Sequence, residues 1–172
     1  MNSPDRHGIK DPFGGALPHN IEAEECLLGA ILNNNDAFGR IERIVRAEDF
    51  FEPIHREIYA VCQALISDGK IVSPITVKTF LPAELGVVGL TSNQLLARLC
   101  AEATTIINAP DYAHLIRDLA DRRRMITAAE ELVIEARTAV ADVPVKKLVA
   151  AAMKTSQRWN VNSRGRRGIE PS

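Results

Sequence analysis

Aromatic residues and cysteines are scarce in this chain of 172 residues. Only 5% of the residues are aromatic, so Ala, Leu, Ile and Val must fill the core, which favours helices packed on helices. The three cysteines (Cys26, Cys62 and Cys100) are odd in number, widely spaced and without a CxxC pair, and the four histidines show no ligand spacing. We therefore expect reduced, buried cysteines in a cytoplasmic protein that holds no metal or other cofactor.

Long apolar runs and catalytic motifs are also missing. No run approaches the roughly 18 apolar residues of a membrane span, and the first ten residues lack the apolar core of an export signal. The pair Gly69-Lys70 has Ala64 where a phosphate-binding loop requires glycine. Glycine-rich dinucleotide, G-x-S-x-G and H-E-x-x-H patterns are absent as well. The sequence therefore predicts neither an enzyme nor a membrane protein.

Helix signals follow one another along the chain, and no segment shows the two-residue alternation of a strand. The spacing of apolar residues and caps predicts helices over 21–32, from Asp36, over 53–67, over 74–81 and from Thr91, with Phe50 and Phe51 plugging the core from a loop. Glu22, Glu24 and Glu25 are expected to stabilise the first turn through the helix dipole. The predicted fold class is all-α, a compact multi-helix head followed by a long helical hairpin.

The hairpin is the most informative segment. No Gly or Pro interrupts the thirty residues after Pro110, which predicts a helix about 45 Å long. A turn at 142–144 and a second helix from Val145 to about Trp159 would complete the hairpin. Apolar residues recur every seven positions, so the pair carries a seam too extensive to bury on itself. The predicted self-association seam consists of Leu119, Ile126, Val133, Val140, Val149 and Ala152.

Charge divides the chain into an acidic and a basic part. Residues 1–109 carry a net charge of −5 and residues 110–172 a net charge of +4, which suggests two parts with different partners. The predicted organisation is a flexible arm over 1–17, a helical head over 18–108, the hairpin over 110–160, and a basic tail or linker over 161–172. Candidate contacts to nucleic acid are the clustered basic residues Arg122, Arg123, Arg124, Arg164, Arg166 and Arg167.

Several stretches together resemble the N-terminal domain of DnaB-type bacterial replicative helicases. Residues 18–29 read PHNIEAEECLLG, similar to the opening of that domain, where I-E-A-E is followed by L-G. Residues 49–59 read DFFEPIHREIY, similar to the family's D-F-Y and H-R-x-I-[FY] motifs. YAHLIR at 112–117 and RMI at 124–126 follow in the family's order.

The resemblance implies a collar built from several copies of the domain. In the family, hairpins pair into homodimers, three dimers close the collar, and the collar recruits the helicase-binding C-terminal domain of primase or a helicase loader. By local alignment, the residues that match the family's primase-contacting positions are Ile126, Leu132 and Leu148. The motor with its Walker A motif is missing from this chain, and Val88 to Ser92 replace the usual glycine–aromatic stretch.

Two function classes stay open on the sequence. The first is a self-associating interaction module of the helicase collar in DNA replication, which binds primase or a loader. The second is a small basic-tailed helical protein that binds nucleic acid, and single-stranded DNA could also be a weak ligand of the collar module. The scarcity of aromatic side chains weighs against the second class, because single-strand binders stack bases on such side chains. A stand-alone decoy that regulates a host helicase is a further alternative.

Overall fold

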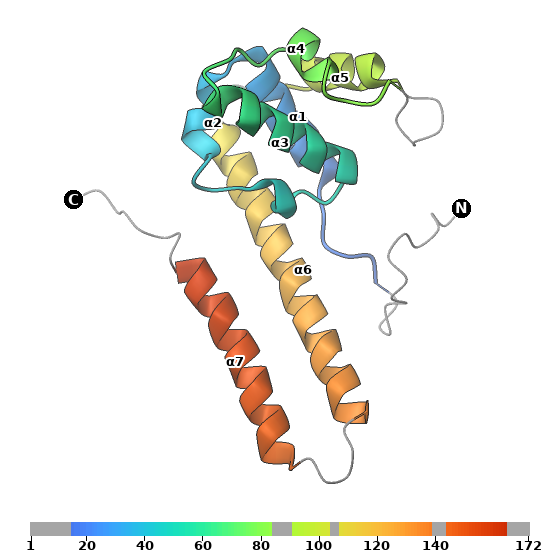
Figure 1. The fold of residues 1–172 in the computed structure, drawn as a ribbon, viewed down its shortest axis with the longest axis vertical. Coiled ribbons are helices and arrows are strands. Elements are labelled where there is room, and N and C mark those ends of the chain that lie inside the picture. The colour runs from blue at the N-terminus through green and yellow to red at the C-terminus, as the bar shows by residue number, and fades with distance from the viewer. Residues whose placement is uncertain (1–14, 84–90, 104–106, 139–143, 165–172) are drawn as a thin grey trace, which may run out of the picture.

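A computed structural model of the chain describes residues 15–83, 91–103, 107–138 and 144–164, with side chains up to Lys154. Its described part contains helices and no β-strand, so the all-α prediction is confirmed. A head of short helices sits on one end of a long hairpin (Figure 1). The elements are α1 (Ile21–Asn33), α2 (Asp36–Ile41), the 3-10 turn η1 (Ala47–Asp49), α3 (Pro53–Ser67), α4 (Pro74–Lys78), α5 (Ser92–Ala101), α6 (Ala109–Thr138) and α7 (Val145–Arg164).

Helix α1 is the centre of the head, as its apolar residues on several sides predict. It begins where the Asn20 side chain accepts a hydrogen bond from the Ala23 N–H. It packs against α2, α3, α5 and α6. Gly29 lies where α1 and α5 approach most closely, since a Cβ built on it would stand 1.9 Å from the Leu99 carbonyl oxygen. The close packing of these two backbones therefore requires a glycine at this position.

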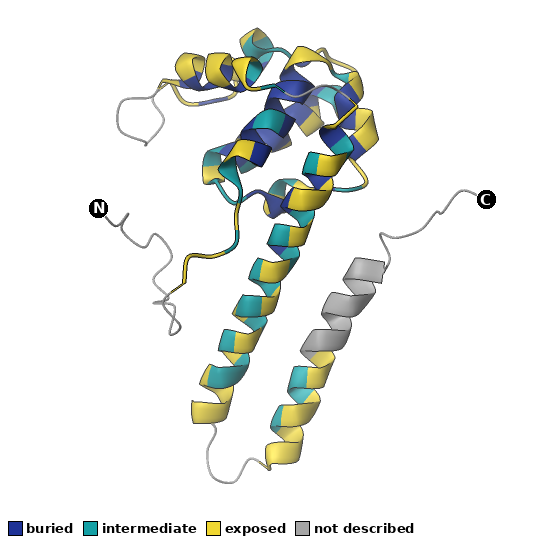
Figure 2. Ribbon diagram, turned by 180° about the vertical axis from the view of Figure 1, so that it is seen from behind, coloured by how far each residue is buried: buried dark blue, intermediate teal, exposed yellow. Residues whose placement is uncertain are grey.

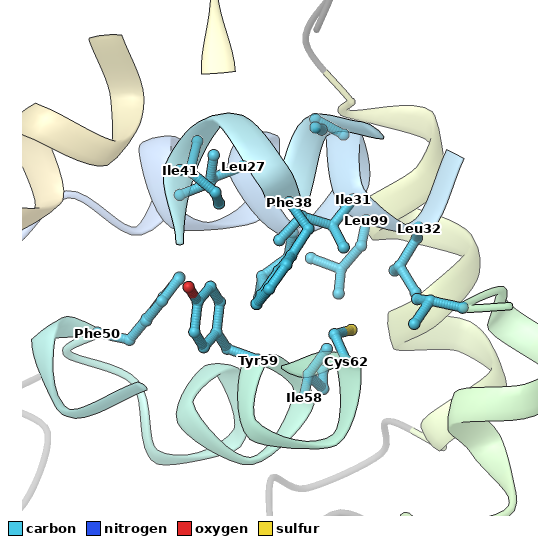
Figure 3. Packing of buried hydrophobic residues seen from close by; sticks show 14 of the residues in the cluster. Leu27, Ile31, Leu32, Phe38, Ile41, Phe50, Ile58, Tyr59, Cys62 and Leu99 are labelled. Carbon is cyan, nitrogen blue, oxygen red and sulfur yellow. The ribbon is translucent and has the colours of Figure 1, made fainter. Parts of the chain in front are cut away.

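Three aromatic rings close the core on the side of α3. Tyr59 is fully buried and lies between Phe38 and Phe50, with ring centroids 5.6 and 5.1 Å away (Figure 3). Its hydroxyl donates a hydrogen bond to the Val45 carbonyl oxygen, 3.0 Å away, so the polar end of the ring is satisfied. Phe50 thus plugs the core from the loop after η1, as predicted, whereas Phe51 is only half-buried.

Only the N-terminal part of α6 is buried against the head. Ala109, Ala113, Ile116 and Ala120 are buried, and beyond them no residue described in the hairpin is buried. The rest of α6 and the antiparallel α7 project away from the head (Figures 1 and 2). Burial therefore ends at the twelfth residue of a helix whose thirty residues span about 45 Å.

Some element ends differ from the sequence-based expectation. Helix α4 ends at Lys78 instead of reaching Leu81, because the chain tightens into three-residue turns there, although Leu81 is still buried. The sequence also suggests Asp36 as the N-cap of the second helix, but Asp36 is the first residue of α2 and Asn35 occupies the cap position. The Asn35 side chain makes no cap hydrogen bond and instead bonds the backbone of Ile31 and Val72. Helix α7 continues to Arg164, past the predicted end at Trp159.

The cysteines are free, and one of the three is buried. Cys62 lies in the core, and burial raises the pKa of its thiol to about 12. Cys26 on α1 and Cys100 on α5 are only half-buried, contrary to the expectation of buried cysteines. Burial also raises the pKa of both thiols, so all three favour the unreactive protonated form at neutral pH.

Candidate partner interface

A buried carboxylate joins α1 to the start of α3. One oxygen of Glu24 accepts the Phe51 N–H at 2.5 Å, and the other accepts the Glu52 N–H at 3.3 Å. The second oxygen also lies 2.8 Å from Nδ1 of His55, in a contact that is buried on both sides. Glu24 therefore satisfies amide donors at the N-terminus of α3. Glu24 lies in the first turn of α1, where the helix dipole favours its charge as expected, and it also binds the start of α3, which the sequence did not indicate.

A second buried carboxylate fixes α6 to the head. Asp49 is fully buried, accepts the Arg46 N–H at 2.8 Å, and forms an ion pair with Arg124. Arg123 donates to the carbonyl oxygens of Asp49 and Pro18 at 2.5 and 2.7 Å. These bonds hold α6 against η1 and against the segment that enters α1. They set the direction in which the hairpin leaves the head.

The pKa values of the two arginines at this junction, Arg123 and Arg124, shift in opposite directions. Burial lowers the pKa of Arg123. Burial also acts to lower the pKa of Arg124, but the hydrogen bonds and negative charges of Asp49 and Asp121 together outweigh it, so that pKa is raised. Arg123 additionally lies over the Phe51 ring, 5.5 Å from its centroid, and His19 stacks on the same ring at 4.2 Å.

Helix α7 has an apolar face that α6 covers only in part. At 100° per residue, Leu148, Ala152, Val145, Val149 and Met153 lie side by side around the helix. Leu148 and Ala152 are half-buried on the side nearest α6. Solvent reaches the other three, whose exposed fractions are 72% for Val145, 48% for Val149 and 62% for Met153. We call these three residues the α7 stripe.

Helix α6 likewise has both half-buried and exposed apolar residues. Three residues of the predicted seam, Leu119, Ile126 and Val133, are half-buried. Among the exposed apolar side chains, Met125, Ala129 and Ala136 share an adjacent strip of the helix, whereas Ile134, which is 55% exposed, lies on the opposite side of the helix from Met125. Part of the predicted seam is thus covered within the chain, and the apolar surface still open to a partner lies on both sides of it, at Met125 and at Ile134.

The remaining predicted residues fall into distinct settings. Val149 is exposed, and Ala152, Leu132 and Leu148 are half-buried. Val140, Arg166 and Arg167 lie outside the described residues, as does the side chain of Arg164. Arg122 is exposed and pairs with Asp118 at 2.8 Å. Arg123 and Arg124 donate to acceptors inside the chain, which leaves Arg122 as the most accessible guanidinium of the triplet.

Three comparisons with known proteins agree. The family model described as "DnaB-like helicase N terminal domain" matches residues 16–118, which is more than half of the chain. The chain belongs to this family. The DnaB N-terminal domain of Mycobacterium tuberculosis has a similar structure, with a TM-score of 0.71 and 25% identity over 81% of this chain and 97% of that one.

Relatives of this DnaB-type domain include complete helicases. The chain is 34% identical to the replicative DNA helicase DnaB of Rickettsia felis and 38% identical to that of Rickettsia typhi. These matches cover 82% and 79% of the chain but only 28% and 27% of the two helicases. The chain therefore corresponds to the N-terminal domain of a replicative helicase. No helix in its described part is long and apolar enough to cross a membrane.

Sequence reasoning about this DnaB-type domain missed the residues that hold the hairpin in place. Glu24 and His55 are 31 positions apart, and Asp49 and Arg124 are 75 apart. Charged side chains in the first turn of a helix and in an arginine run are usually solvated, so spacing alone does not reveal such pairs. The family motifs around residues 24, 49 and 55 were the available signal, since each contains one member of a buried pair.

Proposed function

We propose that this domain acts as a self-associating protein-interaction module of a replicative helicase, and that its hairpin binds a second copy of the chain. The observation that supports this most directly is the α7 stripe, together with Met125 on α6. These side chains stand clear of the head core. Their burial between two hairpins would remove apolar surface from water at about 25 cal/mol for each Å².

Primase or a helicase loader is the proposed second partner. Membership of the DnaB family supports this choice, and the hairpin offers an apolar surface flanked by charge. The three residues aligned with the family's primase-contacting positions, Ile126, Leu132 and Leu148, are half-buried beside the exposed strips. A partner that docks on the strips would meet the edges of these residues. Joined to a motor, such a module would form part of the collar.

Sedimentation equilibrium of matched α7 variants tests self-association. Val149→Asp places a charge in the α7 stripe, whereas Ala150→Asp places the same charge one residue further on, outside the apolar face. We expect the first variant to weaken association at least tenfold, because an unpaired carboxylate would be desolvated in the interface. The second should associate nearly as the parent does, and circular dichroism should report equal helix content.

Binding of the primase C-terminal domain, measured by calorimetry, tests the second partner. Leu132→Ala and Leu148→Ala should each reduce affinity, whereas Ala150→Asp should leave it unchanged. A parent chain that stays strictly monomeric at about 100 μM and binds neither primase nor a loader would contradict the proposed function.

Direct contact with nucleic acid has less support. Two of the three clustered arginines on α6 are engaged by Asp49, Asp121 and backbone carbonyls. A titration with single-stranded DNA at about 50 mM salt tests this alternative, because binding through phosphates is strongest at low salt.

A further inference from the structure

The head carries a second exposed apolar patch on the segment around α4, at the end of the head remote from the hairpin turn (Figure 1). Three large side chains within ten residues lie mostly in solvent, with exposed fractions of 75% for Ile71, 81% for Ile75 and 59% for Phe80. We call these three residues the α4 patch. Single exposed apolar residues are ordinary on protein surfaces, but three in so short a segment mark a candidate contact surface.

Local hydrogen bonds fix the backbone that presents the α4 patch. The hydroxyl of Ser73 accepts the Thr76 N–H, and the Ser73 N–H donates back to Oγ1 of Thr76 at 2.8 Å. The Thr76 hydroxyl also lies 3.1 Å from the Ile71 carbonyl oxygen. Other residues of the same segment anchor it, because Val72, Val77 and Leu81 are buried in the head core. The patch is thus part of a fixed surface.

The charged side chains within the segment of the α4 patch are cationic, and the acidic residues Asp68 and Glu84 flank that segment in the sequence. Residues 69–83 contain two lysines and no acidic residue. Lys70 is neutralised by Asp68, 3.1 Å away. Lys78 lies three positions after Ile75 on the same side of α4, is exposed, and has no ion-pair partner among the described residues. A ligand that covers the patch would meet an unpaired cation at its rim, which favours a carboxylate there.

The size of the α4 patch limits what can cover it. Three side chains with these exposed fractions present roughly 400 Å², well below the roughly 800 Å² per partner of a stable protein–protein interface. A second copy of the domain would need much further surface to dimerise here. A short peptide needs no more than this area, because two or three apolar anchors and a charge pair complete its contact.

We propose that the α4 patch docks a short acidic peptide segment of another protein, with two or three large apolar side chains that lie on Ile71, Ile75 and Phe80 and a carboxylate that pairs with Lys78. This contact is separate from the hairpin surface of the proposed function. The domain can therefore hold a peptide at the head while its hairpins are occupied.

Three synthetic peptides of twelve residues, each with a fluorescent label, test the α4 patch. The first alternates Asp or Glu with Leu and Phe, the second replaces every acid with Lys, and the third replaces every apolar residue with Ser. We expect the full chain to bind the first at least tenfold more tightly than either of the others. Amide signals of residues 70–81 in nitrogen–proton spectra should shift on binding, and those of α7 should not.

Variants of the full chain distinguish specific binding of the peptide at the α4 patch from nonspecific binding elsewhere. Ile75→Ser should weaken binding of the acidic peptide about tenfold. Ile107→Ser removes an equally exposed isoleucine outside the patch and should change nothing. Lys78→Glu should weaken binding of the acidic peptide and strengthen binding of the lysine peptide.

Three results would overturn the proposal: equal binding of all three peptides, no binding of any of them, or shifts confined to the hairpin. A loss of self-association in Ile75→Ser would also overturn it, because it would identify a second copy of the chain as the occupant. None of these results bears on Val149→Asp, so the proposed function stands or falls separately.

Discussion

The head and the outer part of the hairpin contain similar apolar residues but bury them to different degrees. In the head, Leu27, Leu28, Ile31 and Ile58 are completely covered. Beyond Ala120, comparable side chains such as Ile126 and Val133 are at most half-buried, and Met125 is mostly exposed. The same hydrophobic effect thus stabilises the fold in one region and remains available for association in the other.

The charged groups of the two regions also differ in how far they are buried. The carboxylates of Glu24 and Asp49 are buried, and each makes several hydrogen bonds. On the hairpin, the pair between Arg122 and Asp118 is exposed on both sides. Buried pairs cost much free energy when one partner is removed, whereas exposed pairs contribute little. Substitutions in the head should therefore affect folding, and those on the outer hairpin should affect association.

The largest effect is expected at Glu24. Glu24→Ala leaves two amide donors and a buried histidine without their acceptor, so we expect the free energy of unfolding to fall by about 3–5 kcal/mol. Glu22→Ala is the matched control, because Glu22 is exposed in the same helical turn. Urea unfolding followed by circular dichroism measures both. A loss below about 1 kcal/mol at Glu24 would mean that the buried network contributes little to stability.

The next largest effect is expected at Gly29. Gly29→Ala puts a methyl group 1.9 Å from the Leu99 carbonyl oxygen, so α1 and α5 must separate. We expect a loss of about 3 kcal/mol in the free energy of unfolding. Gly39→Ala on α2 meets no atom within 4 Å and should be neutral or stabilise by up to about 1 kcal/mol, because alanine favours the helix. Equal effects at the two glycines would contradict the close approach of α1 and α5.

The fold of the head was largely predictable from local signals in the sequence. Caps and proline positions gave the starts of α1, α3, α4 and α5, since each start depends on groups within three residues. The end of α4 at Lys78 was missed, because a short helix can tighten into turns without any change in which residues are buried. The all-α class followed from the absence of strand periodicity.

The candidate interface was only partly predictable. The seven-residue repeat identified the apolar seam on α6, but it did not show how much of that seam α7 would cover. Rotation of one helix against the other decides whether Ile126 or Met125 faces solvent, and that rotation depends on contacts between helices. The buried pairs at residues 24 and 49 were missed for the same reason, as each partner lies on a distant element.

A smaller effect is expected at the junction between head and hairpin. Arg124→Met removes the cation that faces the buried Asp49, so we expect the free energy of unfolding to fall by about 2 kcal/mol. The effect is moderate because Arg124 is itself only half-buried. Arg122→Met, two positions earlier on the same helix, removes an exposed pair and should cost less than about 0.5 kcal/mol. Thermal unfolding of the two variants measures the difference, and a reversed order would refute the assignment of Arg124 to the junction.

The smallest effect on folding is expected in the α7 stripe. Val149→Ser removes an exposed methyl surface, so at about 1 μM the free energy of unfolding should change by less than about 0.5 kcal/mol. The dependence of the melting temperature on protein concentration then distinguishes association through the hairpin from the stability of the head. If the hairpin binds a second copy, mass action raises the melting temperature of the parent chain as its concentration increases. Val149→Ser should flatten that rise, whereas Ala150→Ser, outside the apolar face, should retain it. A melting temperature that is independent of concentration in all three proteins would show that the exposed stripe does not drive association.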